Sequence, residues 1–207
     1  MRFRRITGWI TGRAMAMLVL GLVLFLGVHS TRIVAEGWRT AMLARLGEKG
    51  WKGLYTLASL AGFALIVWGY SQARQQPVVL WVPPRGMNHL AALLMVGSFI
   101  LLAATYVPRN HIKARLHHPM VLSVKVWALA HLLANGNVAD VLLFGSFLVW
   151  AVFSFRAARG RDRAGNIAYA PGTAAGTATA VVVGLVAWVV FVFWAHAWLI
   201  GVSPLGM

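Results

Sequence analysis

Six apolar stretches, separated by short polar segments, limit the folds that are open to this chain of 207 residues. They cover residues 14–34, 54–70, 89–107, 119–134, 138–155 and 174–200. A transmembrane helix needs about 20 mainly apolar residues. Lipid offers no hydrogen-bond partners to an open strand, and no stretch alternates as the strands of a membrane barrel do. The sequence therefore predicts an all-α fold, a polytopic integral membrane helical bundle of about six transmembrane helices, in which 119–134 is the shortest and most polar span.

The composition argues against a soluble nucleic-acid-binding domain. Charged residues make up 11% of the chain and hydrophobic residues 60%, whereas a soluble domain carries about 25% charged residues. The formal net charge of +15 comes from Lys and Arg scattered between the apolar stretches, where such residues fix topology and meet anionic headgroups. We therefore expect the lipid bilayer as a partner and no nucleic acid. The chain has no cysteine, which excludes disulfides, thiolate metal sites and covalent haem attachment.

The distribution of Lys and Arg between the two sides of the predicted spans gives an orientation. The N-terminus and the second and fourth loops carry six, which are Arg2, Arg4, Arg5, Arg13, Arg74 and Arg85. The first, third and fifth loops carry twelve, which are Arg32, Arg39, Arg45, Lys49, Lys52, Arg109, Lys113, Arg115, Arg156, Arg159, Arg161 and Arg163. Because the more basic side is cytoplasmic, we expect the odd loops in the cytoplasm and both termini in the periplasm.

Residues 1–13 are predicted to be a basic N-terminal extension, followed by a single transmembrane domain over 14–207. The four arginines of the extension oppose the orientation given above. Translation from Met15 or Met17 would remove all four. The alternative is a cleaved signal peptide with residues 14–28 as its apolar core. No small-x-small cleavage site follows directly, which favours an uncleaved first helix.

Local structure can be predicted for two connections between the spans and for four glycines within them. Residues 36–53 alternate apolar and basic side chains in a pattern typical of an amphipathic helix at the membrane interface. Residues 135–137, Asn-Gly-Asn, predict a tight turn between antiparallel helices. Four glycines within the spans are expected to permit close helix approach: Gly62, Gly69, Gly145 and Gly184.

The seven histidines are the residues best suited to carry chemistry. Three of them, His29, His131 and His196, lie inside predicted spans. The other four are His89, at the start of the third span, and His111, His117 and His118, in the loop before the fourth. An ionisable group at membrane depth is costly, so a functional role is the default hypothesis, and neutral imidazole is a common haem ligand. The alternative is that each histidine only forms interhelical or headgroup-level hydrogen bonds.

Several segments resemble the NnrU family of membrane proteins. They are LGLVLFLGVHSTR (20–32), GLYTLASLAGFALIVWGY (53–70), PVVLWVPP (77–84), HHPMVLSVKVWALAHLLANGNVADVLLFGSFLVWA (117–151) and LIGVSP (199–204). The resemblance covers nearly the whole chain after Met15. It implies a bacterial inner-membrane protein of nitric oxide metabolism and denitrification. The family is similar to the plastid zeta-carotene isomerase, a haem b enzyme of the same superfamily, so the resemblance also implies haem b as a cofactor.

The resemblance to the isomerase implies particular ligands. Its His-Ser element matches His29-Ser30, and its His-Pro element, followed by a W-x-L-A-H run, matches His118-Pro119 and Trp127 to His131. This implies His29 and His131 as the axial ligands of the haem iron. The isomerase carries a cysteine three residues before the second histidine, where this chain has Ala128. Sulfur ligation is therefore not carried over.

Two cations and one further histidine are candidates for the same haem site. Lys125 lies inside a predicted span, and the chain has only four carboxylates. A haem propionate would supply the missing negative charge for Lys125 or Arg32, whereas snorkelling to the interface is the alternative for Lys125. His118 is a candidate because of the spacing of His29 and His131. Predicted span boundaries place those two roughly 10 to 15 Å apart in depth. Continuation of the first helix past Arg32 toward Trp38 would remove that difference; otherwise His29 would pair with His118, and His131 with His196 or His89.

Three functional hypotheses follow. The first is a haem b membrane protein of the NnrU type in nitrogen-oxide metabolism. The second is a haem-dependent isomerase of a lipophilic polyene, by analogy with the plastid relative, and the third is a nonenzymatic accessory factor without cofactor. No nucleophile–base pair, phosphate loop or carboxylate dyad supports a hydrolase or a kinase.

Overall fold

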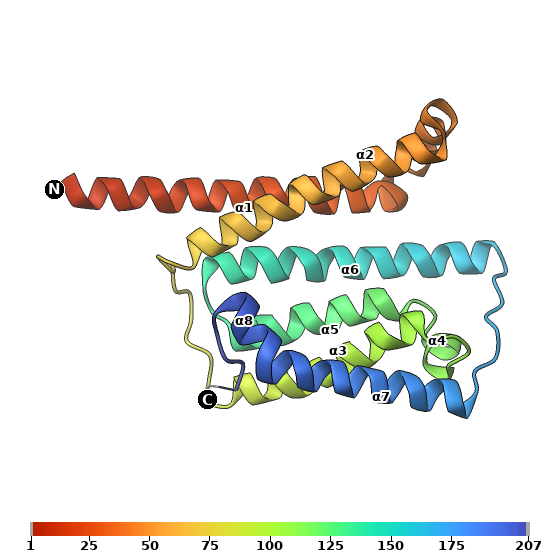
Figure 1. Cartoon of the computed structure of the whole chain (residues 1–207). Coiled ribbons are helices and arrows are strands. Elements are labelled where there is room, and N and C mark those ends of the chain that lie inside the picture. Colours follow the sequence, from red (N-terminus) through yellow and green to blue (C-terminus); the bar gives the residue numbers. More distant parts are fainter. Residues whose placement is uncertain (1, 206–207) are drawn as a thin grey trace. The chain divides into compact units, whose positions relative to one another are not determined.

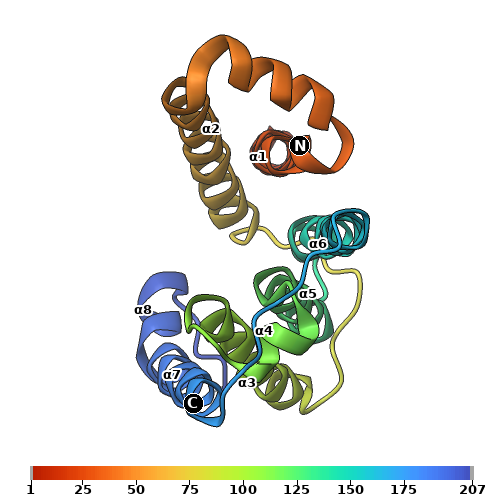
Figure 2. The ribbon, with the colours of Figure 1, turned by 90° about the vertical axis from the view of Figure 1, so that its right-hand side faces the viewer.

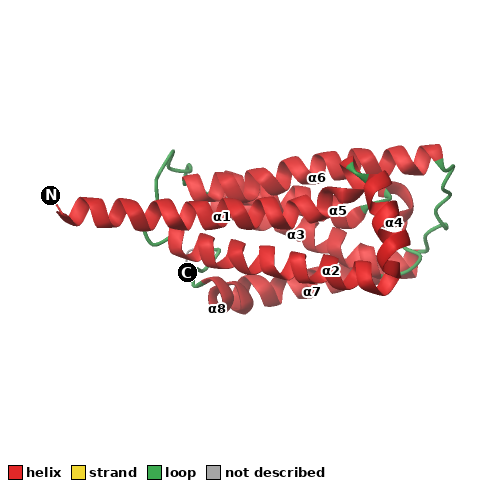
Figure 3. Cartoon of the chain, turned by 90° about the horizontal axis from the view of Figure 1, so that it is seen from above, coloured by secondary structure: helices red, strands yellow, loops and turns green. Residues whose placement is uncertain are grey.

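The computed structural model describes the backbone of residues 2–205 and the side chains from residue 12 onward (Figure 1). The side chains of Arg2, Arg4 and Arg5, which belong to the predicted basic extension, lie outside the described part. The helices are α1 (Arg2–Val34), α2 (Glu36–Ala73), α3 (Met87–Tyr106), α4 (His111–Leu116), α5 (Pro119–Ala134), α6 (Val138–Ala164), α7 (Ala174–Val190), the π-helix η1 (Phe191–Ala195) and α8 (His196–Ile200). Between residues 2 and 205 there is no strand, only two isolated bridges, which confirms the all-α prediction (Figure 3).

Five helical segments are long and apolar enough to cross a membrane. They are Gly12–Val34, Glu36–Ala73, Met87–Tyr106, Val138–Ala164 and Ala174–Ile200. The sixth predicted span is α5, which is apolar but has only 16 residues. The prediction of about six spans, with the fourth the shortest, is confirmed by the lengths and compositions of these helices.

The chain divides into two compact units. The first contains Met1–Trp81 and Asn137–Ser146, and the second contains Val82–Gly136 and Phe147–Met207. The division falls within α6.

In the first unit, α1 and α2 lie side by side and run antiparallel (Figure 2). Their backbones come close at glycines. A Cβ atom at Gly21 would lie 2.6 Å from the backbone nitrogen of Ile66, and one at Gly62 would lie 2.8 Å from that of Phe25. A Cβ at Gly69 would overlap the backbone of Leu18. Small residues permit this approach in membranes, where helix association relies on packing rather than on exclusion of water.

The path of α2 differs from the expectation. The predicted interfacial helix over 36–53 and the span from 54 are instead two helices joined at Gly47, whose backbone is not helical (φ 68°, ψ 170°). Glycine adopts a positive φ without steric cost, so the bend falls there. The helix that contains the predicted span begins directly after the bend and is longer than the apolar stretch alone indicates.

In the second unit, α3 packs against both α5 and α7 (Figure 2). The Ser98 hydroxyl of α3 donates to the backbone carbonyl of Ser123 in α5 at 3.0 Å. The Trp188 indole of α7 donates to the carbonyl of Ala92 in α3 at 3.0 Å. The predicted close approach at Gly184 is confirmed, since a Cβ there would lie 2.6 Å from the Cα of Ile100.

The same expectation for Gly145 is wrong. Among the described residues, no heavy atom comes within 4 Å of a Cβ placed there. The predicted break between the fourth and fifth spans is confirmed, because α5 ends at Ala134 and α6 begins at Val138, and Asn135 has extended backbone angles (φ −131°, ψ 142°).

Candidate functional site

His29 lies in the last third of α1 and is half-buried. Its Nδ1 is 2.7 Å from the carbonyl oxygen of Phe25, one turn earlier. Its ring stacks on Phe25 with centroids 4.2 Å apart, and the Tyr55 ring of α2 lies 5.2 Å away. With its proton on Nδ1, the imidazole donates to its own helix, which fixes the ring and places the ligating lone pair on Nε2.

His131 in α5 repeats this arrangement in the second unit. Its Nδ1 is 2.8 Å from the carbonyl oxygen of Trp127, again one turn earlier. The Trp127 ring lies 5.3 Å from the imidazole and 5.4 Å from the ring of Phe147. Ala128, where the isomerase carries a cysteine, is fully buried. Both histidines therefore fit an iron atom chemically, because ligating imidazoles usually donate their other N–H to a carbonyl or a carboxylate.

The pairing of these two histidines stays a prediction. His29 belongs to the first unit and His131 to the second, and the structure describes each within its own unit. The condition that would remove the difference in depth between them, continuation of the first helix to Trp38, is not met. The helix ends at Val34, and Ala35 has non-helical backbone angles (φ −139°, ψ 40°). His29 therefore stays about one and a half turns from the end of its helix.

Arg32 and Lys125 lie in different surroundings. Arg32 is exposed, and its Nε is 3.9 Å from a carboxylate oxygen of Glu36. Lys125 Nζ lies 5.2 Å from the centre of the Phe155 ring, and no carboxylate among the described residues is within 4 Å of it.

The register of α5 separates Lys125 from His131. Six residues correspond to about 600° of rotation, so the two lie on different faces of the helix. His118 is seven residues before Lys125 and so shares its face, and both side chains approach the Phe155 ring. The structure therefore places Lys125 and His118 on the same side of α5, next to Phe155, and His131 on another side.

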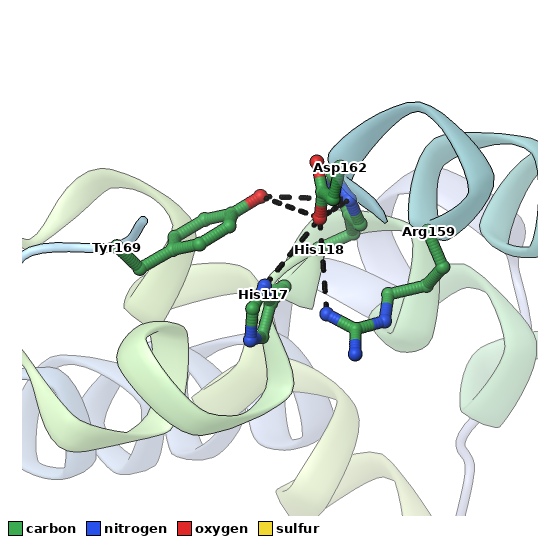
Figure 4. A network of polar contacts seen from close by, with 5 residues as sticks. All are labelled: His117, His118, Arg159, Asp162 and Tyr169. Carbon is green, nitrogen blue, oxygen red and sulfur yellow. Dashed lines mark hydrogen bonds and ion pairs between the residues drawn. The ribbon is translucent and has the colours of Figure 1, made fainter. Parts of the chain in front are cut away.

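His118 is part of a polar cluster centred on Asp162 (Figure 4). The contacts of Asp162 Oδ2 are His118 Nε2 at 2.9 Å, Tyr169 Oη at 3.1 Å, His117 Nδ1 at 3.4 Å and Arg159 Nη1 at 3.8 Å. These groups come from the α4–α5 junction, the end of α6 and the loop before α7. Only 12% of the Asp162 side chain is exposed, and this residue is the one carboxylate in the sequence of the second unit.

The backbone at His117 is strained. It has φ 71° and ψ −72°, and the His118 N–H donates to the carbonyl of Leu116 at 3.1 Å, which closes a γ-turn. A positive φ of this kind is rare for a residue with a side chain and costs on the order of 1 to 3 kcal/mol. Pro119 then opens α5, where its missing N–H costs nothing. The contacts of both histidine rings with Asp162 and Tyr169 offset that strain.

Tyr169 lies outside the spans, and its pKa is raised above the ordinary value. Burial is the largest cause, followed by the hydrogen bond to Asp162 and the negative charge of that carboxylate, while Arg159 acts in the opposite direction. The phenol is therefore a hydrogen-bond donor throughout the neutral range. The cluster joins the α4–α5 corner to the loop before α7, because His118 and Tyr169 both form hydrogen bonds with the Asp162 carboxylate.

The sequence analysis singled out the histidines of this cluster but not its other three residues. Asp162, Arg159 and Tyr169 are 41 to 52 residues from His117 and His118 along the chain, so no local spacing connects them. One signal was present. Asp162 is the single acidic residue within a run of four arginines at 156, 159, 161 and 163. Among the described residues, no group of three or more His, Asp or Glu side chains has a geometry that could hold a metal ion.

These features define a class: a polytopic helical membrane protein with histidines inside its spans and a histidine–carboxylate cluster at one end of its second unit. The chain belongs to the NnrU family, because the family model described as NnrU protein matches residues 17–204. No curated protein and no solved structure matches the sequence.

Proposed function

We propose that the chain is a haem b protein of the bacterial inner membrane, in which His29 and His131 would hold the iron, and that it acts in nitric oxide and denitrification metabolism. The observation that supports it is the matched geometry of the two histidines. Each directs Nδ1 to the carbonyl of the residue four positions earlier, and an imidazole with its proton on Nδ1 would hold iron through Nε2. The metabolic role rests on membership of the NnrU family.

Within this proposal, the histidines and the aromatic rings beside them have different roles. His29 and His131 hold the iron, and the rings of Phe25 and Trp127 restrict the rotation of the two imidazoles. Bound haem would supply one-electron redox chemistry and a binding position for a small gas ligand. His118 is the weaker ligand candidate, because its Nε2 is engaged by Asp162 at 2.9 Å.

The test is an absorption spectrum of the full chain purified in mild detergent, with and without haem supplementation during expression. We expect a Soret band in the parent, loss or a strong shift of that band in His29→Ala and His131→Ala, and retention in His118→Ala and His196→Ala. A colourless parent after supplementation overturns haem binding. Retention of the parent spectrum in His29→Ala or His131→Ala overturns the ligand assignment.

The proposed orientation is tested separately. Both termini are placed in the periplasm and the loops around Lys49, Lys113 and Arg161 in the cytoplasm, on the distribution of basic residues. Alkaline phosphatase fused after residue 207 is expected to be active, whereas a fusion within 165–173 is expected to be inactive. The reverse pattern would overturn this orientation without affecting haem binding.

A further inference from the structure

An unbroken series of aromatic rings leads from His29 to the surface of the first unit. The ring centroids of His29 and Tyr55 are 5.2 Å apart, those of Tyr55 and Trp51 are 6.4 Å apart, and those of Trp51 and Trp38 are 5.7 Å apart. Trp51 is only 8% exposed, whereas Trp38 is 52% exposed. The series therefore begins at a half-buried histidine, passes through a buried indole and ends at an accessible one.

The bend in α2 makes this series possible. Trp38 and Trp51 are thirteen residues apart, and an unbroken α-helix would separate them by about 20 Å along its axis. The non-helical backbone at Gly47 folds the segment before it back, so that the two indoles meet edge to face at 73°. Trp51 and Tyr55 are then one turn apart on the same face of the helix, toward His29 of α1.

An interfacial aromatic belt does not account for Trp51. Belt tryptophans place their rings at the headgroup level, as the exposed Trp68 of the same helix can do with 55% of its surface accessible. Trp51 is instead enclosed between Trp38 and Tyr55. Indole is the most easily oxidised apolar side chain, and one-electron transfer between rings in van der Waals range is fast.

We infer that Trp51 and Trp38 form a one-electron relay between the His29 site and the exterior, with the Tyr55 ring as the bridge. A one-electron oxidant at the His29 end, of the class of a peroxide-oxidised metal centre, takes one electron from Trp51 and is itself reduced by one. Trp38 returns an electron to the Trp51 radical cation. The oxidised Trp38 then takes one electron from an aqueous donor of the ascorbate class, so both indoles end unchanged and no proton is consumed within the relay. This spares His29 and its neighbours from oxidation.

The inference rests on the proposed function only for the source of the oxidant, so its test uses a photo-oxidant and no haem. The chain has no cysteine. Replacement of the exposed Thr56, next to Tyr55, by cysteine allows a single ruthenium polypyridine label on the full chain in lipid nanodiscs. After flash oxidation with an external electron acceptor, transient absorption distinguishes tryptophanyl from tyrosyl radicals. The decay in the presence of ascorbate reports contact with the aqueous phase.

In the labelled parent we expect a tryptophanyl radical that ascorbate reduces quickly. Trp51→Phe is expected to lose this signal, and Trp38→Phe is expected to keep the radical on Trp51, where ascorbate reduces it much more slowly. Trp68→Phe is the matched control in the same helix and is expected to behave as the parent does. Equal radical yield and decay in the parent, Trp51→Phe and Trp38→Phe would overturn the relay. A relay confirmed in a protein that binds no haem would refute the proposed function and leave this inference in place.

Discussion

Both units of this protein bring helices close together at glycines, Gly184 in the second unit included, but they differ in the groups that surround these contacts. In the first unit, Gly21, Gly62 and Gly69 let the backbones of α1 and α2 come into direct contact, and aromatic rings fill the space around His29. In the second unit, hydrogen bonds between helices and loops are prominent, and they converge on polar groups such as Ser98 and Asp162. The surroundings of the histidines differ in another way. His29 and His131 meet aromatic rings, whereas His117 and His118 at the end of the second unit also meet a carboxylate.

Glycine contacts and hydrogen bonds are expected to contribute differently to stability. Backbone contact through glycine tolerates no added atom, since neither partner can move without moving its helix. A hydrogen bond in a membrane protein contributes less, because the unfolded chain in the bilayer also finds partners. Added volume at a contact glycine should therefore cost more stability than the loss of one polar partner.

Gly69→Val is expected to have the largest effect. The new Cβ would overlap the backbone of Leu18, so α1 and α2 must separate, at a cost of about 3 kcal/mol. Unfolding of the purified protein by SDS in mixed micelles measures the change. Gly27→Val in α1 is the matched control, because nothing lies within 4 Å of a Cβ at that position. Equal stability of the two variants would show that the glycine contact does not hold the first unit together.

Asn110→Ala should have the next largest effect, in the second unit. The Asn110 side chain is 1% exposed, donates to the carbonyls of Ala104 and Val107, and accepts from the backbone N–H of Lys113 as the cap of α4. Loss of the cap and of both donors is expected to reduce the free energy of unfolding by about 2 kcal/mol. The half-buried Asn88, whose Oδ1 lies 3.0 Å from His89, provides the control, and Asn88→Ala should change stability by less than about 0.5 kcal/mol. An equal loss of unfolding free energy in both variants would mean that the hydrogen bonds of Asn110 contribute no more to stability than those of an ordinary half-buried asparagine.

A smaller effect is expected between α3 and α5. The hydroxyls of Ser98 and Ser123 are 3.1 Å apart and buried. A double-mutant cycle with Ser98→Ala and Ser123→Ala should give a coupling energy of about 0.6 kcal/mol, the average found for hydrogen bonds between transmembrane helices. A coupling near zero would mean that the Ser123 carbonyl, which both variants keep, is the only partner that matters.

The sequence contains enough information for the spans but not for their bends and ends. Apolar length alone defines the six helices, and the polar character of 119–134 correctly marks α5 as the short one. Apolar length does not predict that α6 continues to Ala164. The added residues include arginines, which form helices as readily as most apolar residues do. Apolar length does not predict the bend of α2 at Gly47 either, because a glycine next to charged residues is compatible with a helix or a turn.

The site is predictable only in part for a related reason. His29 and His131 stand out individually, since a histidine inside a span is rare and costly. Their hydrogen bonds to Phe25 and Trp127 follow from helix geometry once the helices are known. The Asp162 cluster depends on tertiary structure, because the α4–α5 corner and the loop before α7 meet only when α3, α5 and α7 are packed.

The titration of Tyr169 provides the finest test of the contrast. Its pKa is raised by burial and then by Asp162, so the stabilisation from this bond is fully present at neutral pH and below, and it is lost as the pH rises through the raised pKa. The difference in phenolate absorbance between the parent and Tyr169→Phe during an alkaline titration isolates this group. Asp162→Asn removes a cause of the rise, so the pKa of Tyr169 should fall toward its ordinary value. Arg159→Gln removes the one opposing influence, so the pKa of Tyr169 should rise further, and this second variant keeps the carboxylate and both histidine contacts. The absence of a shift in both variants would mean that burial alone sets the pKa of Tyr169 and that the carboxylate is not the centre of the cluster.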